Sequence, residues 1–325
     1  MIDFKGKVAV VTGGGTGMGR ELVQQLAAAG CHVAMCDVSA ENMATSKAYA
    51  EESAPAGTRI TTHLCDVSNE DQVKAFRDAV EEAHGATLNL LFNNAGIGGG
   101  GGFVAGDRGE WERTFNVCWF GVYYGCREFV PMIVASDEGH IINTSSVNGF
   151  WASIGYGVPH TAYSAAKFAV KGFTEALVTD LRVNAPHVAC SVVMPGHIGT
   201  DIAINSGLVL GHNPALDMTE DEVRQVRENM MRSAGPMSEA IMNMSDDQIR
   251  QAIHDRGIMF RENAPTSAAE AATIILDGVK AKRWRILVGD DAHNLDANVR
   301  AAPEQAYEPD FAGMDLAASA AGEND

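Results

Sequence analysis

The chain has few basic residues. Lys and Arg number 24 against 42 Asp and Glu, which leaves a formal net charge of −18 over 325 residues. A surface of this sign repels nucleic acid and anionic membranes, so we expect neither as a partner. The chain also has no apolar run near the roughly 20 residues that a membrane helix needs. A charged fraction of 20% and a hydrophobic fraction of 46% exclude a disordered or fibrous protein.

Other signals are also missing. The first seven residues have no apolar core of a secretory signal, so we expect a cytoplasmic protein. The six cysteines are scattered without a Cys-x-x-Cys pair, which predicts reduced and buried thiols. The ten histidines show no paired ligand spacing, so we expect no metal site.

What the chain does contain is a regular alternation of short apolar runs and longer stretches of helical period. The predicted strands are Lys7–Thr12, His32–Asp37, Arg59–Cys65, Leu88–Asn93, His140–Ser145, His187–Met194 and Arg285–Gly289. The predicted helices are Gly17–Ala29, Ala40–Ser53, Asn69–His84, Trp111–Ala135 and Thr161–Asn184. The fold class is therefore α/β, a doubly wound Rossmann-type fold with a seven-stranded, mostly parallel sheet and helices on both faces. Its ligand crevice is expected at the carboxyl ends of the strands.

Two segments interrupt this alternation. Residues 201–263 are Met-rich and helical in period, and they form either a flap packed on the sheet or a mobile lid over a substrate. Residues 266–270 predict a capping box that opens the last helix before the final strand. We expect residues 1–289 to form one domain with this insertion. Residues 290–325 form an acidic extension, for which disorder and docking on a neighbouring subunit are both open.

A glycine-rich turn, TGGGTGMG at 12–19, joins the first predicted strand to the first predicted helix. Unpaired amides and the helix dipole at such a site favour an anion, and glycines let a pyrophosphate approach the backbone closely. No Lys-Ser/Thr pair follows, which excludes a triphosphate-binding P-loop. The turn predicts a dinucleotide site.

Asp37 ends the second predicted strand. A carboxylate there accepts hydrogen bonds from both ribose hydroxyls of an adenosine and repels a 2′-phosphate. Neither 14–16 nor 38–40 offers an Arg or Lys to hold such a phosphate. The residues predict NAD as the cofactor rather than NADP. The alternative is a surface Asp that caps the next helix.

Tyr163 and Lys167 stand four residues apart at the start of a predicted helix, so their side chains share a face. A nearby ammonium favours the phenolate and lowers the pKa of a tyrosine from about 10. Ser145 and Ser146 end the fifth predicted strand and add a hydroxyl that can bind a reacting oxygen.

Over residues 5–289 the chain resembles the short-chain dehydrogenase/reductase family. The matching motifs are TGxxxGxG at 12–19, Asp66-Val67, Asn93-Asn94-Ala95-Gly96, Asn116, Ser146, Tyr163-x-x-x-Lys167 and Pro195-Gly196-x-x-x-Thr200. The resemblance implies that Tyr163 exchanges a proton with the substrate oxygen and that Ser146 hydrogen-bonds this oxygen. Lys167 would hold the nicotinamide ribose and lower the Tyr163 pKa. Asn116 would kink its helix and bind a water that relays protons to Lys167.

The resemblance also implies a cofactor site. Asp66 and Val67 would contact the adenine, Asn93 the adenosine side, and Ile198 with Thr200 the carboxamide and phosphates. The predicted cofactor-binding residues are Gly13, Thr16, Gly17, Met18, Asp37, Asp66, Val67, Asn93, Tyr163, Lys167, Ile198 and Thr200.

The chain departs from the family pattern in the loop 149–160, which is longer than usual. Phe150, Trp151 and Tyr156 in this loop either line an apolar substrate pocket or pack at a subunit interface. Residues 98–102 are five glycines, typical of a flexible loop, at the expected mouth of the active site. For His160 and His197 the sequence favours surface or packing roles over substrate contact.

These features predict an enzyme that transfers a hydride between NAD(H) and a secondary alcohol or ketone, an apolar small molecule. A 3-oxoacyl thioester reductase and a cis-dihydrodiol dehydrogenase are the alternatives. A dinucleotide-sensing regulator is disfavoured because Tyr163 and Lys167 are both present. The resemblance further implies a homotetramer or homodimer, built partly from helices 111–135 and 161–184.

Overall fold

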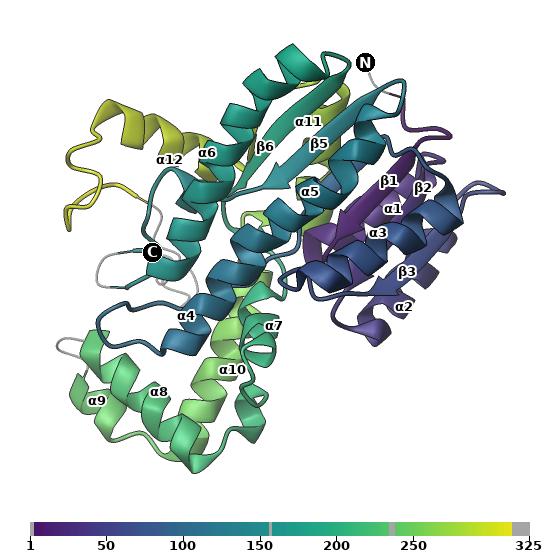
Figure 1. Ribbon diagram of the computed structural model, residues 1–325. Coiled ribbons are helices and arrows are strands. Elements are labelled where there is room, and N and C mark those ends of the chain that lie inside the picture. The colour runs from purple at the N-terminus through teal and green to yellow at the C-terminus, as the bar shows by residue number, and fades with distance from the viewer. Residues whose placement is uncertain (1–2, 156–157, 234–237, 314–325) are drawn as a thin grey trace.

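The computed structural model describes residues 3–155, 158–233 and 238–313, and its centre is a parallel sheet covered by helices on both faces (Figure 1). The seven strands run in the order β3-β2-β1-β4-β5-β6-β9. They are β1 (Val8–Thr12), β2 (His32–Asp37), β3 (Ile60–Leu64), β4 (Leu90–Asn93), β5 (Gly139–Thr144), β6 (Val188–Pro195) and β9 (Arg285–Val288). The predicted doubly wound fold is confirmed, and each predicted strand is present.

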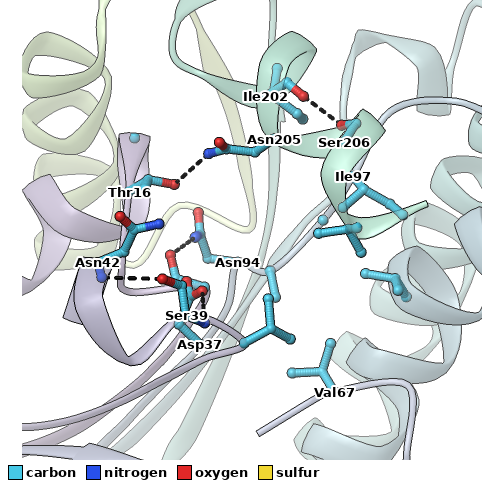
Figure 2. A pocket seen from close by; sticks show the side chains of 18 of the residues that line it. Thr16, Asp37, Ser39, Asn42, Val67, Asn94, Ile97, Ile202, Asn205 and Ser206 are labelled. Atoms are coloured by element: carbon cyan, nitrogen blue, oxygen red, sulfur yellow. Dashed lines mark hydrogen bonds between the residues drawn. The ribbon is translucent and has the colours of Figure 1, made fainter. Parts of the chain in front are cut away.

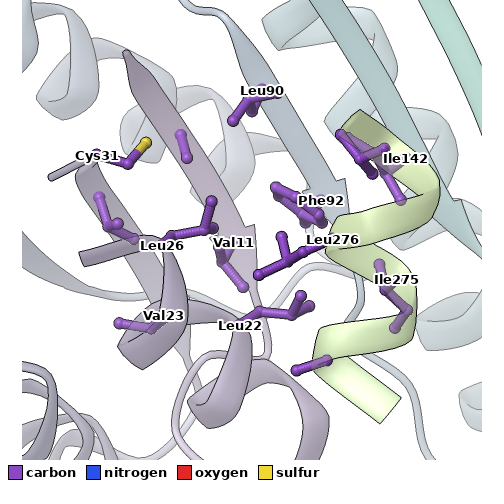
Figure 3. Close-up of a cluster of buried hydrophobic side chains, with 14 of the residues drawn as sticks. Val11, Leu22, Val23, Leu26, Cys31, Leu90, Phe92, Ile142, Ile275 and Leu276 are labelled. Atoms are coloured by element: carbon purple, nitrogen blue, oxygen red, sulfur yellow. The ribbon is translucent and has the colours of Figure 1, made fainter. Parts of the chain in front are cut away.

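One face of the sheet is covered by α1 (Gly17–Ala28), α2 (Ala40–Glu51) and α11 (Ala268–Lys280). Figure 3 shows Leu22 of α1 and Leu276 of α11 meeting Val11 and Phe92 of the sheet. The other face is covered by α3 (Glu70–His84), α5 (Gly121–Val134) and α6 (Thr161–Asn184). The central strands are therefore buried on both sides, which explains their near-continuous apolar sequence.

The chain changes direction across the sheet between β1 and β4. Strands β2 and β3 extend the sheet on one side of β1, and β4 then pairs with β1 on its other side, with Val11 opposite Phe92. Such a switch point opens a crevice at the carboxyl ends of the two strands. The glycine-rich turn follows β1 and Asn94 follows β4, so both border this crevice.

The predicted helix 111–135 is interrupted. It consists of α4 (Arg108–Phe115), the π-helical segment η1 (Asn116–Phe120) and α5. The N–H of Gly121 donates to the carbonyl oxygen of Asn116, five residues earlier. Short π-helical segments occur often at functional sites. The interruption starts at Asn116, the residue for which the family resemblance implied a kink.

The insertion 201–263 is helical, as predicted. It contains α7 (Ile202–Val209), η3 (Ala215–Asp217), α8 (Glu220–Ser233), α9 (Ser238–Met242) and α10 (Asp246–Glu262). A small core of its own includes Met218, Val223 and Ile249. Its two ends are joined because β7 (Ile198–Gly199) pairs in parallel with β8 (Thr266–Ser267). The predicted capping box is confirmed: Ser267 Oγ accepts from the N–H of Glu270 at 3.2 Å, and the Ser267 N–H donates to the Glu270 carboxylate at 2.9 Å.

The first part of the acidic extension is an ordered helix, α12 (Asp290–Ala301), which packs on its own chain. Arg285 of β9 binds both carboxylate oxygens of Asp296, at 2.5 and 3.0 Å. The Trp151 indole N–H donates to the carbonyl oxygen of Ala306 at 2.6 Å. Residues 290–313 are therefore ordered rather than disordered, and docking on a neighbouring subunit stays a prediction. The remaining residues of the extension, 314–325, lie outside the described part of the chain.

His140 of β5 is fully buried in the sheet. Its Nε2 lies 2.6 Å from Ser191 Oγ, and this hydroxyl donates its own proton to the carbonyl oxygen of Arg283. Ser191 must therefore accept from a protonated Nε2, which fixes the neutral tautomer with the hydrogen on Nε2. Burial lowers the pKa of His140 to about 3.

This histidine should make the protein sensitive to mild acid. The unfolded chain takes up a proton near pH 6.5, whereas folded His140 resists protonation down to pH about 3, so the free energy of unfolding falls as pH falls between these values. His140 should account for about 2 kcal/mol of the fall in the free energy of unfolding between pH 7 and pH 5. Urea unfolding at both pH values should show a smaller difference for His140→Gln. The exposed-histidine variant His293→Gln is the control, and an unchanged difference for His140→Gln would contradict this assignment.

Candidate active site

Two cavities meet at the carboxyl edge of the sheet. The first has a volume of about 610 Å³ and is lined by the glycine-rich turn and Asp37. The second, of about 560 Å³, is lined by Ser146, Tyr163 and Lys167. The residues that line both are Met18, Asn94, Gly96, Thr200, Ile202 and Ser206. The two cavities therefore adjoin along these shared residues.

The glycine-rich turn brings the backbone close to the first cavity. Gly13 and Gly17 have positive φ angles of 66° and 51°. A Cβ at Gly13 would lie 2.8 Å from the Cα of Ala95, so a larger residue does not fit. Thr16, the N-cap of α1, makes no side-chain cap hydrogen bond, which leaves the first amides of the helix available for an anion. The predicted residues Gly13, Thr16, Gly17 and Met18 all line this cavity.

Asp37 is held at the wall of the same cavity (Figure 2). Its Oδ2 accepts from the N–H of Gly15 and its Oδ1 from the N–H of Ser39, both at 3.0 Å. The N-cap of α2 is Ser39, whose side chain accepts from Asn42 N at 3.2 Å. Asp37 is therefore not a helix cap, and the alternative derived from the sequence is wrong.

Asp66 and Val67 line the first cavity as predicted. Burial raises the pKa of Asp66, but hydrogen bonds from Ser68 and the Arg113 guanidinium outweigh it and hold this pKa below its usual range. Arg113 Nη1 lies 2.8 Å from Asp66 Oδ2. Arg113 is a cavity residue that the sequence reasoning missed, and its charge is matched by Asp66.

The structure does not support the predicted role of Asn93 in cofactor binding. This residue was predicted to contact the adenosine side of the cofactor, but it is 1% exposed and its amide donates to Asn143 Oδ1 at 2.8 Å. Its side chain faces Gly125 of α5, where a Cβ would be 2.2 Å from Asn93 Oδ1. Because successive strand residues point to opposite faces, it is the next residue, Asn94, that lines both cavities.

The second cavity brings Ser146, Tyr163 and Lys167 together. Ser146 follows β5, and Tyr163 and Lys167 lie one turn apart on α6. The Ser145 hydroxyl donates to the carbonyl oxygen of Lys167 at 2.7 Å and joins the two elements. Lys167 Nζ donates to the carbonyl oxygen of Thr144 at 2.9 Å and lies 5.3 Å from the centre of the Tyr163 ring. The predicted convergence of these three side chains is present.

The predicted lowering of the Tyr163 pKa is not found. Burial raises this pKa above its usual value, Cys118 adds to the rise, and a hydrogen bond with Ser146 acts against it. Burial also lowers the pKa of Lys167. Burial disfavours the charged form of both groups, so in this arrangement the phenol keeps its proton at neutral pH. Tyr163 is thereby a proton donor in its resting form.

The remaining predicted site residues are Ile198, Thr200 and Asn116. Ile198 lines the second cavity and Thr200 lines both. Asn116 is half-buried at the start of η1 and lines neither. The implied water relay from Asn116 stays a prediction.

The side chains of Phe150 and Trp151 do not line the second cavity. They were predicted to line a substrate pocket or a subunit interface, but both pack against the C-terminal extension of their own chain. Trp151 is 4% exposed, with its ring 6.3 Å from that of Phe311. From the same loop, Ile154 lines the second cavity instead. Tyr156, also predicted to contact substrate, lies outside the described residues.

The glycines 98–101 form part of the wall of the second cavity. A Cβ at Gly99 would lie 2.7 Å from Leu210 Cδ1, and one at Gly100 would lie 2.8 Å from the Cβ of Ala162. They were interpreted as a flexible loop, but close packing against α6 and the segment after α7 is what requires glycine here.

Among the described residues, three histidines line the second cavity, His160, His197 and His212, and a role was predicted from the sequence for the first two. The His160 ring lies 4.9 Å from the Tyr163 ring, and burial lowers the His160 pKa to about 4. His197 Nε2 donates to the carbonyl oxygen of Phe260 at 2.7 Å, which joins the loop after β6 to α10. The packing role that the sequence favoured fits His197, whereas His160 lies beside Tyr163.

Helix α7 borders the first cavity through contacts that have no local signal in the sequence. Asn205 Nδ2 donates to Thr16 Oγ1 at 3.4 Å, and the N–H of Gly98 donates to Ser206 Oγ at 2.8 Å. Figure 2 shows Ile202 and Ser206 across the cavity from Asp37. These pairs are remote in sequence, so no motif spacing can predict them. The Met-rich composition suggested a lid only as one of two alternatives.

Neither a cluster of metal ligands nor a membrane-spanning helix is found within residues 3–155, 158–233 and 238–313. There, no three His, Cys, Asp or Glu side chains gather as metal ligands, and no helix has the length and apolarity to cross a membrane. The six cysteines are buried and unpaired.

Comparison with known proteins identifies the family. The model of the short chain dehydrogenase family matches residues 7–208, so the chain belongs to this family of oxidoreductases. Levodione reductase of Leifsonia aquatica is 34% identical over 212 residues, which are 62% of this chain and 73% of that protein.

Two solved structures of the family differ in cofactor. One, a short-chain dehydrogenase/reductase from Burkholderia phymatum in complex with NAD, is 30% identical with a TM-score of 0.73, covering 94% of this chain and 95% of its own. The other, a metagenomic short-chain oxidoreductase in complex with NADP, is 32% identical with a TM-score of 0.53, covering 60% of this chain and 84% of its own. Family membership therefore leaves NAD and NADP both open.

Proposed function

We propose that this oxidoreductase transfers a hydride between NAD(H) and a secondary alcohol or the matching ketone. The observation that carries the proposal is that the cavity at Asp37 and the glycine-rich turn adjoins the cavity at Ser146, Tyr163 and Lys167. When bound, a nicotinamide cofactor supplies or accepts the hydride. The first cavity has the glycine-lined turn and free helix amides that suit a dinucleotide pyrophosphate.

The side chains of the second cavity transfer the proton and bind the substrate oxygen. For ketone reduction, Tyr163 donates a proton to the substrate oxygen while the Ser146 hydroxyl hydrogen-bonds it. For alcohol oxidation, Tyr163 must first lose its proton and then accepts the one on the substrate. Lys167 orients this site through its hydrogen bond to the carbonyl of Thr144. Its ammonium group can also hold a ribose hydroxyl.

The preference for NAD rests on Asp37. Both of its carboxylate oxygens are anchored by backbone N–H groups, so the negative charge is fixed at the cavity wall. A 2′-phosphate placed there would be repelled. The two basic side chains nearby are engaged: Arg113 with Asp66, and Arg20 with the carbonyl oxygen of Gly15 at 2.7 Å.

Replacing Asp37 by Asn removes the charge but keeps an acceptor for the N–H of Gly15. We expect kcat/KM with NAD to fall by about tenfold to a hundredfold, the value of a charge-assisted hydrogen bond, and the bias against NADP to relax. Asp37→Ala should also lower kcat/KM with NAD and relax the bias against NADP. It should in addition loosen the glycine-rich turn, because the N–H of Gly15 loses its acceptor. The measurement is kcat/KM with each cofactor, and Asp71→Asn, an exposed residue on α3, is the control. An unchanged NAD/NADP ratio would exclude Asp37 as the selector.

The lining of the second cavity supports an apolar substrate. Ile154, Leu210, Ile253 and Phe260 contribute to its wall. A 3-oxoacyl thioester reductase and a cis-dihydrodiol dehydrogenase use the same proton chemistry and remain alternatives within the proposal. A regulator without turnover is disfavoured because the three reacting side chains converge in a cavity large enough for a substrate.

The test of this function is NADH formation at 340 nm with a panel of secondary alcohols. The panel spans terpene alcohols, hydroxysteroids, cyclic diols and hydroxyacyl thioesters, each measured with NAD and with NADP. Turnover with one class and NAD supports the proposal and narrows the substrate. No turnover with any class, with NAD binding intact by calorimetry, would favour the regulator.

We also propose that the protein forms a homodimer or homotetramer. Tyr123 of α5 and Phe168 of α6 are exposed large side chains on helices that the family resemblance placed in the interface. Trp119 and Phe173 pack edge to face beside them, with ring centres 5.6 Å apart. Analytical ultracentrifugation measures the association state directly.

A further inference from the structure

Helix α10 presents one face to the second cavity. The residues of this face are Ile253, Arg256, Gly257 and Phe260, at positions i, i+3, i+4 and i+7. Such a stripe is the inward face of a helix, and three of its four members are apolar or lack a side chain. Arg256 is the exception, an exposed cation at the solvent side of an otherwise apolar wall.

Arg256 differs from those arginines of the insertion whose ion pairs the structure describes. Arg227 pairs with Asp246, Arg250 with Asp247, and Arg261 with Asp201. Within the described residues, Arg256 has no carboxylate within ion-pair distance. Its own helix neighbours at i−4 and i+3 are Ala252 and Met259, which are apolar. The guanidinium is therefore a positive charge without a counter-charge, in a chain with a net charge of −18.

The other charged or titratable groups around the cavity are already engaged. Glu110 of α4 lies 2.9 Å from His212 Nε2, and Lys167 donates to the carbonyl of Thr144. Burial lowers the pKa of both His160 and His197, so neither adds a positive charge at neutral pH. Among the described charged side chains that line this cavity, Arg256 is thus the one without a hydrogen-bond or ion-pair partner.

We infer that the substrate carries an anionic group, a carboxylate or a phosphate, and that Arg256 binds it. This deepens the proposed function and rests on it. The reacting carbon lies at Tyr163 and Ser146 and the apolar body lies along α7 and α10, while the anion reaches the outer end of the cavity. A guanidinium binds either oxyanion through two parallel hydrogen bonds, which fixes the orientation of the molecule as well as its affinity.

The first test measures equilibrium binding to the enzyme loaded with NADH, using decanoate, decanamide and decylamine as probes of equal chain length. Wild-type protein is expected to bind decanoate about tenfold more tightly than decanamide. Arg256→Gln should remove this preference, and Arg256→Lys should restore part of it. Arg224→Gln, an exposed arginine on α8, is the matched control. Equal binding of decanoate and decanamide by wild type, or tighter binding of decylamine, would overturn the inference.

The second test separates the two sources of the anion. Oxidation of 3-hydroxydecanoate and of 3-hydroxydecanoyl coenzyme A is followed with NAD, with wild type and with Arg256→Gln. If Arg256→Gln raises KM about tenfold only for 3-hydroxydecanoate, with kcat nearly unchanged, the anion is a carboxylate of a free acid. If the variant raises KM only for the coenzyme A thioester, the anion is a phosphate. Equal KM values of wild type and variant for both compounds would count against Arg256.

Failure of this inference can be told from failure of the proposed function. Tyr163→Phe should abolish oxidation but leave the Arg256-dependent preference for decanoate intact, because the two residues bind different ends of the molecule. If neutral alcohols are oxidised and this preference is absent, the dehydrogenase function stands and the anion site does not. If the preference is present but no alcohol is oxidised, the anion site stands and the proposed reaction does not.

Discussion

Tyr163→Phe is expected to lower turnover by at least about a hundredfold in both directions. Phenylalanine keeps the ring, so the packing against His160 and the shape of the second cavity should persist. What is lost is the hydroxyl that gives a proton to the substrate oxygen and shares a hydrogen bond with Ser146. Steady-state NADH formation measures the rate, and calorimetry should show unchanged NAD binding.

The pH profile distinguishes this role from a structural one. Burial raises the Tyr163 pKa, so the phenol is protonated at neutral pH. Wild-type oxidation should therefore speed up as pH rises, because more phenolate is present, while ketone reduction should slow down at the same high pH. The residual activity of Tyr163→Phe should lack this dependence. Tyr49→Phe, on the exposed side of α2, is the control. A Tyr163→Phe rate near that of wild type would remove Tyr163 from the mechanism.

Trp151→Ala should cost about 3–5 kcal/mol of the free energy of unfolding. The indole is buried against Ala306 and Phe311 of the C-terminal extension and donates to the Ala306 carbonyl. Its removal leaves a cavity and an unpaired carbonyl oxygen at once. Urea unfolding measures the loss. We also expect limited proteolysis to cut within residues 302–313, which this side chain holds in place.

Two variants separate the parts of this effect. Trp151→Phe keeps most of the ring but not the N–H donor, and should cost about 1–3 kcal/mol. Trp284→Ala removes a tryptophan that is 47% exposed and should change stability much less. If the alanine variants at 151 and 284 lost equal stability, or if the extension stayed resistant to protease, Trp151 would not be its anchor.

Features confined to one strand end and the following turn were predictable from the sequence. The glycine-rich turn, Asp37 and the Tyr163–Lys167 pair each lie within a few residues of a strand end or within one helical turn. Their spacing alone therefore brings them to the cavity edge. The capping box at Ser267 belongs to the same group.

Features that depend on burial or on contacts remote in sequence were not predictable. Asn93 and Asn94 are consecutive at the end of β4, and their side chains point in opposite directions. A shift of one residue therefore exchanges a buried amide for a residue that lines the cavity. Trp151 resembles a pocket residue until the partner at Ala306, 155 positions away, is known. The direction of the Tyr163 pKa follows from burial, which composition does not reveal.

The β7–β8 pair has a consequence for how substrate range can diverge in this family. It joins the two ends of the insertion, so residues 202–262 leave and re-enter the dehydrogenase core at neighbouring points. The family match stops at residue 208, while α10 supplies part of the substrate-side wall beyond it. The wall of the second cavity is therefore shared: the family-matched part of the chain supplies Ile154 and the glycines 98–101, and the insertion supplies Ile253 and Phe260. Transplanting codons 202–262 between relatives should therefore shift the substrate range without replacing it, and it should also alter the nucleotide site, because Asn205 and Ser206 of the insertion line the first cavity.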